Sequence, residues 1–102
     1  MMKNKRDEHL IALDEFCVYY KIEQGFVWSL HEAGLVRIET IEDCNYVEEE
    51  NLSALEKFIR FYYDMDINIE GIEAINHLLE QMDEMQHELI SLKNRLRFYE
   101  GG

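Results

Sequence analysis

The fold of this chain is decided by residues 23–47, which read EQGFVWSLHEAGLVRIETIEDCNYV. An offset of three residues places Val27 and Leu30 on one side of a helix predicted over Glu23–Ala33. Gly34 follows at the position where a left-handed residue commonly ends a helix. The first half of the stretch therefore predicts a short amphipathic helix with a glycine stop.

The second half of the stretch predicts a β-hairpin. Arg37–Ile41 is β-branched and alternates loosely between apolar and polar residues, and Cys44–Val47 is typical of the returning strand. Glu42 and Asp43 would form the turn between the two strands. A short helix followed by a two-stranded hairpin is the arrangement of a winged helix-turn-helix domain, in which the hairpin is the wing.

Upstream of this stretch, the sequence predicts an extended segment and another short helix. Leu10–Leu13 is apolar and predicts a leading strand or an extended lead-in. Asp14 is a suitable N-cap, because its carboxylate can accept hydrogen bonds from the free amides of a first helical turn. Residues 15–20 would form that helix, with one apolar face made by Phe16, Cys17 and Tyr20.

Downstream, a third helix is predicted to end near Asp64–Asp66. Its start is marked by the acidic triplet Glu48–Glu50, whose charge favours a helix N-terminus. Ser53 fits a capping box, and Asn51 is an equally good cap. The apolar stripe of this helix consists of Leu52, Leu55, Phe58, Ile59 and Tyr62.

The last predicted element is one long amphipathic helix from Ile69 to about Phe98, capped by Asn68. Its apolar residues recur at steps of three and four, which is the pattern of a coiled-coil seam. The distal part of the seam has nothing in its own domain to pack on, so we expect a homodimer. The residues expected to form its interface are Met82, Met85, Leu89, Leu92, Leu96 and Tyr99.

The domain organisation follows from these elements. We expect a flexible N-terminus over residues 1–9, a winged helix-turn-helix domain over 10–66 and a dimerisation helix over 67–102. The fold class is mainly α, with a small two-stranded wing and a long C-terminal coiled-coil helix.

The charge distribution contradicts the usual role of such a domain. The formal net charge is −12, and between Ile22 and Glu56 the only Lys or Arg is Arg37, against nine acidic residues. A DNA-binding winged helix needs cations on this face to contact phosphates. The acidity disfavours nucleic acid and anionic membranes as partners and favours a basic protein.

Other classes of function find little support in the sequence. There is no glycine-rich phosphate loop or nucleophile motif, and His77 and His87 lack the spacing of a metal pair. We therefore expect no catalysis, cofactor or metal. No apolar run is long enough to span a bilayer, and the charged start is no signal peptide, which predicts a cytoplasmic protein. Cys17 and Cys44 are expected to be free, buried thiols.

Several short motifs give the chain a family resemblance over about residues 10–98. They are Glu15-Phe16-Cys17, Gly34-Leu35-Val36, Gly71-Ile72 and Asn94-Arg95-Leu96. Their order and spacing resemble the MerR-type winged helix and, more specifically, the CbpM family of bacterial chaperone modulators. That family commonly has Trp-Pro-Gly where this chain has Ile69-Glu70-Gly71.

The resemblance implies a non-enzymatic role. CbpM-like proteins bind the J-domain of a DnaJ-like co-chaperone, CbpA, and restrain its work with the Hsp70 chaperone. For the surface that contacts this partner, charge favours Glu42, Asp43, Glu48, Glu49 and Glu50, with Phe26 or Trp28 as an aromatic anchor unless these two pack in the core. The alternatives are a MerR-like DNA-binding transcription regulator and an adaptor for another basic protein.

Overall fold

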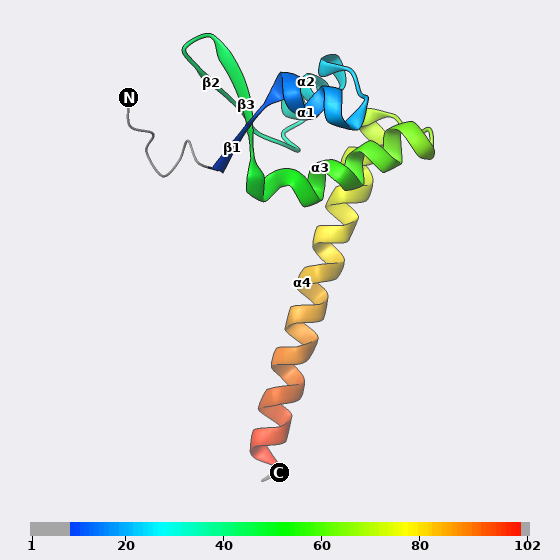
Figure 1. The fold of residues 1–102 in the computed structure, drawn as a ribbon. Coiled ribbons are helices and arrows are strands. Elements are labelled where there is room, and N and C mark those ends of the chain that lie inside the picture. Colours follow the sequence, from blue (N-terminus) through cyan, green and yellow to red (C-terminus); the bar gives the residue numbers. More distant parts are fainter. Residues whose placement is uncertain (1–8, 101–102) are drawn as a thin grey trace. The chain divides into compact units, whose positions relative to one another are not determined.

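The structure is a computed structural model that describes residues 9–100, so the N-terminal prediction lies almost wholly outside the described part (Figure 1). The chain divides into two units, Met1–Ile72 and Glu73–Gly102. The division lies inside the last helix, because Ile72 is fully buried with the core of the first unit. The mainly helical winged fold predicted from the sequence is confirmed.

The first unit contains a small antiparallel sheet of three strands (Figure 1). These are β1 (Leu10–Ala12), β2 (Ile38–Ile41) and β3 (Cys44–Glu48), in the order β1-β3-β2. The predicted two-stranded wing is therefore incomplete. β3 uses one edge to pair with β2 and the other to pair with β1, from Leu10 opposite Glu48 to Ala12 opposite Tyr46. This pairing satisfies backbone groups that β1 would otherwise leave without partners.

Helix α1 (Leu13–Tyr20) follows β1 without a loop, and this continuity overturns the predicted cap. The N-cap residue is Ala12, which has extended geometry and no side-chain capping bond. Asp14 is instead the second residue of the helix, where its carboxylate accepts a hydrogen bond from Gln24 Nε2. Asp14 thus ties α1 to the start of the next helix.

Helix α2 (Gln24–Glu32) ends as predicted at a left-handed glycine. Gly34 has φ of +78°, its amide donates to His31 O at 3.0 Å, and the amide of Leu35 donates to Leu30 O at 2.9 Å. These two bonds form a Schellman motif, which satisfies the last carbonyls of the helix. The motif turns the chain toward Val36, which is buried.

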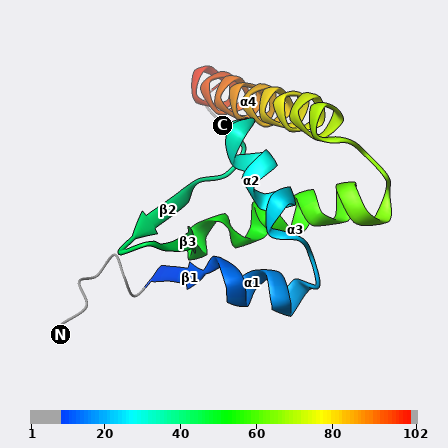
Figure 2. The same cartoon turned by 90° about the horizontal axis from the view of Figure 1, so that it is seen from above.

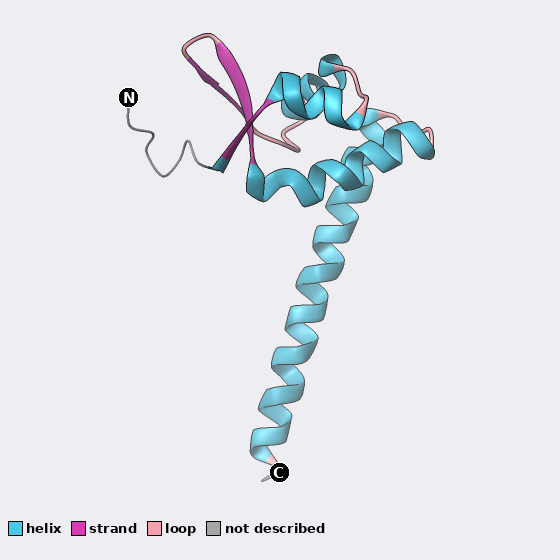
Figure 3. Ribbon diagram, in the orientation of Figure 1, coloured by secondary structure: helices cyan, strands magenta, loops and turns pink. Residues whose placement is uncertain are grey.

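The third helical segment, drawn as continuous helix in Figure 3, has three parts. A 3-10 turn, η2 (Glu49–Asn51), leads into α3 (Leu52–Ile59), and a π-helical turn, η3 (Arg60–Asp64), extends it to Met65. The predicted end is confirmed. Of the two predicted caps, Asn51 occupies the N-cap position of α3 but makes no side-chain capping bond, and its backbone is helical (φ −89°, ψ −3°) rather than extended as is usual for a cap. Ser53 lies inside the helix.

The core of the first unit is formed by residues of α1, α2 and α3 together with residues of the sheet, and Figure 2 shows these three helices at one end of the strands. Cys17 is buried in it, as predicted, but the same prediction for Cys44 is wrong. Cys44 pairs with Ile41 beside the hairpin turn, beyond the buried pair Ile38 and Val47. The buried apolar residues are Leu13, Phe16, Cys17, Phe26, Val27, Leu30, Val36, Ile38, Val47, Leu55, Phe58 and Ile72.

Helix α4 (Ile69–Tyr99) has 31 residues, close to the predicted range. Asn68 is its predicted cap, and Asn68 Oδ1 accepts a hydrogen bond from the Gly71 amide at 2.8 Å. Beyond Ile72 the helix forms the second unit. In this unit the six residues predicted to form the dimer interface are exposed, from 52% for Leu89 to 81% for Tyr99.

Candidate functional site

The turn of the wing presents two exposed carboxylates, Glu42 and Asp43, which we call the turn pair. Both residues are left-handed, with φ of 49° and 67°. Positive φ at both central residues is the geometry of a type I′ hairpin turn, which matches the twist of the flanking strands. The predicted turn is thus confirmed, although residues with a Cβ rather than glycine occupy it.

The base of the wing presents three more carboxylates, Glu48, Glu49 and Glu50, which we call the base cluster. Glu48 is the last residue of β3, and Glu49 and Glu50 begin η2. Five residues of strand rise roughly 17 Å, so the base cluster lies at the opposite end of β3 from the turn pair. The structure thus divides the five predicted acidic residues into two groups.

Neighbouring carboxylates affect the ionisation of Glu48 in the base cluster. The pKa of Glu48 is raised above its ordinary value, first by a hydrogen bond with the Glu50 side chain, then by burial and by the charges of Glu50 and Glu39. The positive charge of Arg37 lowers the pKa of Glu48 and so opposes these effects. Glu39 lies on β2 and was not among the predicted site residues. Its contribution follows from the register of the β2–β3 hairpin, in which Glu39 lies opposite Tyr46.

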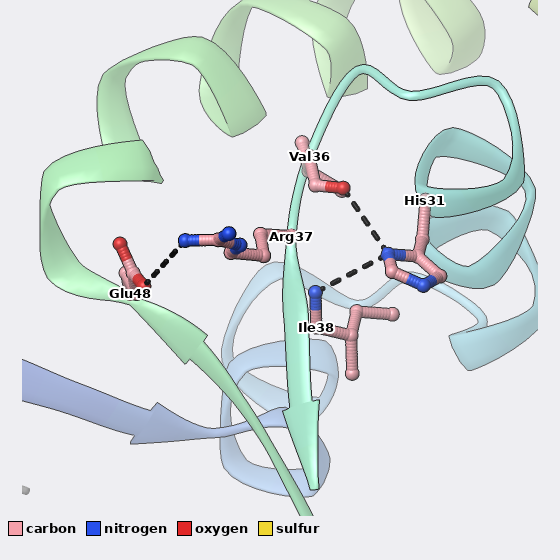
Figure 4. Close-up of polar contacts among 5 residues, drawn as sticks. All are labelled: His31, Val36, Arg37, Ile38 and Glu48. Carbon is pink, nitrogen blue, oxygen red and sulfur yellow. Dashed lines mark hydrogen bonds and ion pairs between the residues drawn. The ribbon is translucent and has the colours of Figure 1, made fainter.

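Arg37 faces the base cluster (Figure 4). Its Nη1 lies 4.0 Å from Glu48 Oε1, and the two side chains are 72% and 19% exposed. The only Lys or Arg between Ile22 and Glu56 is therefore directed toward a carboxylate of the same wing. This contact competes with any use of Arg37 as a phosphate-binding group.

Two shallow hollows flank the base cluster. One, of about 660 Å³, is lined by His9, Leu10 and the three residues of the base cluster. The other, of about 400 Å³, is lined by Glu48, Glu50 and six further residues, which include His31, Leu35 and Arg37. Glu48 and Glu50 line both hollows, so side chains of a partner in either hollow would meet carboxylates.

His31 connects α2 to the start of β2 (Figure 4). Its Nδ1 lies 3.3 Å from the Ile38 amide nitrogen and 3.2 Å from the Val36 carbonyl oxygen. Nδ1 accepts a hydrogen bond from the amide when it lacks a proton and donates one to the carbonyl when it carries a proton. His31 therefore supports the start of β2, which Arg37 precedes and which contains Glu39.

The predicted aromatic anchors are not exposed. Phe26 is only 5% exposed, and its ring lies 4.5 Å from Tyr62 and 5.3 Å from Tyr63, measured between centroids. This packing, supplied by η3, rules out Phe26 as a surface anchor and confirms core packing as its role. Trp28 is half-buried and packs edge-to-face on His31 with centroids 5.7 Å apart.

Helix α2 offers little for reading DNA. It contains no Lys or Arg, and Ser29 Oγ donates to the Gly25 carbonyl oxygen at 2.9 Å. Gln24 donates its side-chain amide to Asp14. The usual contacts of a recognition helix, Arg to guanine and cations to phosphates, have no counterpart on this helix.

The predicted dimerisation residues lie in the second unit. Met82, Met85, Leu89, Leu92, Leu96 and Tyr99 are each more than half exposed. Within residues 9–100, no helix is both long and apolar enough to cross a membrane. The same part of the chain contains no group of three His, Cys, Asp or Glu side chains placed to hold a metal ion.

The arrangement of helix, glycine stop, wing and long terminal helix defines a winged helix-turn-helix protein with an acidic wing. The family model of MerR HTH family regulatory proteins matches residues 11–94. The chain therefore belongs to the MerR HTH family of regulatory proteins. No curated protein and no solved structure matches the chain.

Proposed function

We propose that this protein is a CbpM-like modulator that binds the J-domain of a DnaJ-like, CbpA-type co-chaperone in the cytoplasm and restrains its action with Hsp70. The observation that carries the proposal is the base cluster, which places three carboxylates where a DNA-binding wing needs cations. A basic helix of a J-domain has the complementary charge. The role is non-enzymatic, since a binding protein that covers this helix would act by competition.

Electrostatic complementarity supports this proposal in a specific way. Opposite charges across an interface accelerate association and favour the correct partner more than they raise affinity by themselves. Exposed charges are screened over about 10 Å at 0.1 M salt, so an interface made by the base cluster is salt-sensitive. The net charge of −12 adds a long-range attraction for a basic partner.

The exposed seam of α4 supports the proposal of a homodimer. Six apolar side chains of the second unit are each more than half exposed. Together they form a larger apolar surface than a soluble helix normally leaves in water. Pairing with a second copy would cover them. A dimer would also present two base clusters to its partners.

The test is a calorimetric titration of the J-domain encoded in the same genome into the full chain. We expect saturable binding that weakens steeply with added salt. The triple variant E48Q/E49Q/E50Q removes three charges while keeping the shape of the side chains, and we expect it to bind at least about tenfold more weakly. Absence of binding by the unsubstituted protein at low salt would overturn the proposal.

A matched control separates the position of these charges from their number. The variant E73Q/E84Q/E88Q also removes three charges, from exposed positions on α4. We expect it to bind the J-domain nearly as well as the unsubstituted protein. Equal weakening by both variants would mean that net charge alone drives the binding, against a defined role of the base cluster.

A MerR-like DNA-binding transcription regulator is the second candidate, and membership of the MerR HTH family favours it. Its test is a gel-shift titration with the promoter of the protein's own operon. A shift that persists near physiological salt would support this candidate. Absence of a shift even at low salt would remove it, because the electrostatic contribution to DNA binding is largest there.

A further inference from the structure

The outer face of α1 carries an unusual pair of side chains. Val18 is 78% exposed and Tyr19 is 79% exposed. Among the large apolar residues between 9 and 72, these two are the most exposed, ahead of Met65 at 60%. Consecutive residues point about 100° apart on a helix, so the two side chains together occupy a broad part of the exposed side of α1. In Figure 2, α1 lies at the edge of the first unit, with α2 and α3 on one side of it.

Acidic side chains accompany Val18 and Tyr19. Asp14 and Glu15 lie in the first turn of α1, each four residues before Val18 and Tyr19 respectively. Residues four apart lie on the same face of a helix, so each apolar side chain has a carboxylate one turn away. The last turn of α1 contains no basic residue. This side of α1 is thus apolar and acidic together.

A further carboxylate lies on the neighbouring helix α3. Glu56 accepts a hydrogen bond from the Tyr20 hydroxyl at 2.9 Å, and Tyr20 packs edge-to-face on Tyr19 with centroids 5.0 Å apart. The ring of Tyr19 therefore packs on the ring of Tyr20, whose hydroxyl is hydrogen-bonded to Glu56. A fixed ring loses little conformational entropy when a partner covers it.

The charges identify the kind of partner that would cover this face. A second copy of the chain would bring Asp14 and Glu15 against like charges, and an anionic membrane would be repelled by the same residues. A basic segment would be attracted by them. An aliphatic side chain in that segment could cover Val18, and a Lys or Arg could lie over the ring of Tyr19.

We propose that the outer face of α1, formed by Asp14, Glu15, Val18 and Tyr19, is a docking site for a basic amphipathic helix of the partner protein. This inference rests on the proposed function, whose partner presents such a helix. It supplies the apolar anchor that Phe26, being buried, does not provide. The base cluster attracts the partner by charge, and the α1 face adds apolar contact area.

The experiment compares the full chain with the variant V18S/Y19S in calorimetric titrations against the same J-domain. We expect the variant to bind at least about tenfold more weakly, because exposed aromatic anchors dominate many interfaces. The variant D14N/E15Q should bind severalfold more weakly and show a smaller salt dependence. M65S is the control, since it removes the next most exposed apolar side chain of the first unit and should leave binding unchanged. Circular dichroism melts check that each variant folds.

The outcomes separate the two proposals. If the unsubstituted protein binds and V18S/Y19S binds equally well, the α1 inference is overturned while the proposed function stands. If the unsubstituted protein does not bind the J-domain, both are overturned. If V18S/Y19S changes the sedimenting mass of the protein alone, a second copy covers this face and the inference is wrong.

Discussion

The two units of the chain differ in what they leave exposed to water. The first unit buries twelve apolar residues in one core and carries a strongly acidic surface around its wing. The second unit, the part of α4 beyond Ile72, carries five acidic residues up to Glu88 and three basic residues over 93–97, and it leaves its apolar seam in water. A negatively charged surface favours binding of a basic partner, whereas an apolar helical seam favours packing against another helix. The comparison therefore assigns different kinds of partner to the two units.

The largest expected effect is the loss of stability when a core side chain is truncated, compared with truncation of a seam side chain. Phe58 is 1% exposed, and F58A should lower the free energy of unfolding by about 3–5 kcal/mol through lost burial and a cavity. M85A, at a position 65% exposed, should change the stability of the isolated chain by less than about 0.5 kcal/mol. Urea unfolding at low protein concentration measures both. Equal losses would break the distinction between the units.

The next prediction concerns the seam itself. A chain ending at Gln86 lacks Leu89, Leu92, Leu96 and Tyr99, and we expect it to sediment as a monomer while the full chain sediments as a dimer. The point variant L92K, which places a charge in the seam without shortening the helix, should act in the same direction. A dimer that persists in both would place the interface elsewhere.

Substitution by alanine is expected to have opposite effects on stability at two glycines of the first unit. Nothing lies within 4 Å of a Cβ added at Gly34 or Gly25, so backbone geometry alone decides the result. Gly34 has φ of +78°, and G34A should cost about 1 kcal/mol. Gly25 lies in α2, where G25A should stabilise by roughly 0.5 kcal/mol. Thermal melts of both variants measure the pair, and a stabilised G34A would contradict the Schellman geometry.

The smallest expected effect is the pH dependence contributed by Glu48. Because its pKa in the folded state lies above the ordinary value of 4.5, the folded state binds more protons than the unfolded state in this range. The contribution of Glu48 to stability is therefore present below pH 4.5 and is lost as the pH rises through the raised pKa. E48Q should be more stable than the unsubstituted protein at neutral pH, and the difference should shrink below pH 4.5. E49Q is the comparison variant.

The elements that depend on local sequence were predicted well. The glycine stop at Gly34, the hairpin turn at Glu42-Asp43 and the Asn68 cap each follow from the chemistry of a few adjacent residues. Helix α4 was predicted almost to the residue, because a long periodic pattern is insensitive to its surroundings. The identity of the acidic residues at the base of the wing could likewise be read from the sequence.

The features that depend on distant contacts were missed. Pairing of β1 with β3 joins residues nearly forty positions apart, and it determines that Ala12 rather than Asp14 precedes α1. Core packing of Phe26 was one of the two expected roles, but the tyrosines of η3 that cover its ring could not be identified from the periodicity of α2. The effect of Glu39 on the pKa of Glu48 follows from the β2–β3 register, and Glu39 was not among the predicted site residues. The sequence indicated the turn pair and the base cluster as separate groups, but not that Glu39 adds to the second.

The central claim is that the acidic wing binds a basic protein surface. Its most direct test is the dissociation constant for the J-domain of the same genome, measured at a series of salt concentrations with the unsubstituted protein and with E48Q/E49Q/E50Q. We predict binding that weakens steeply with salt for the first and both weaker binding and a shallower dependence for the second. No binding at low salt, or two identical salt dependences, would contradict the claim.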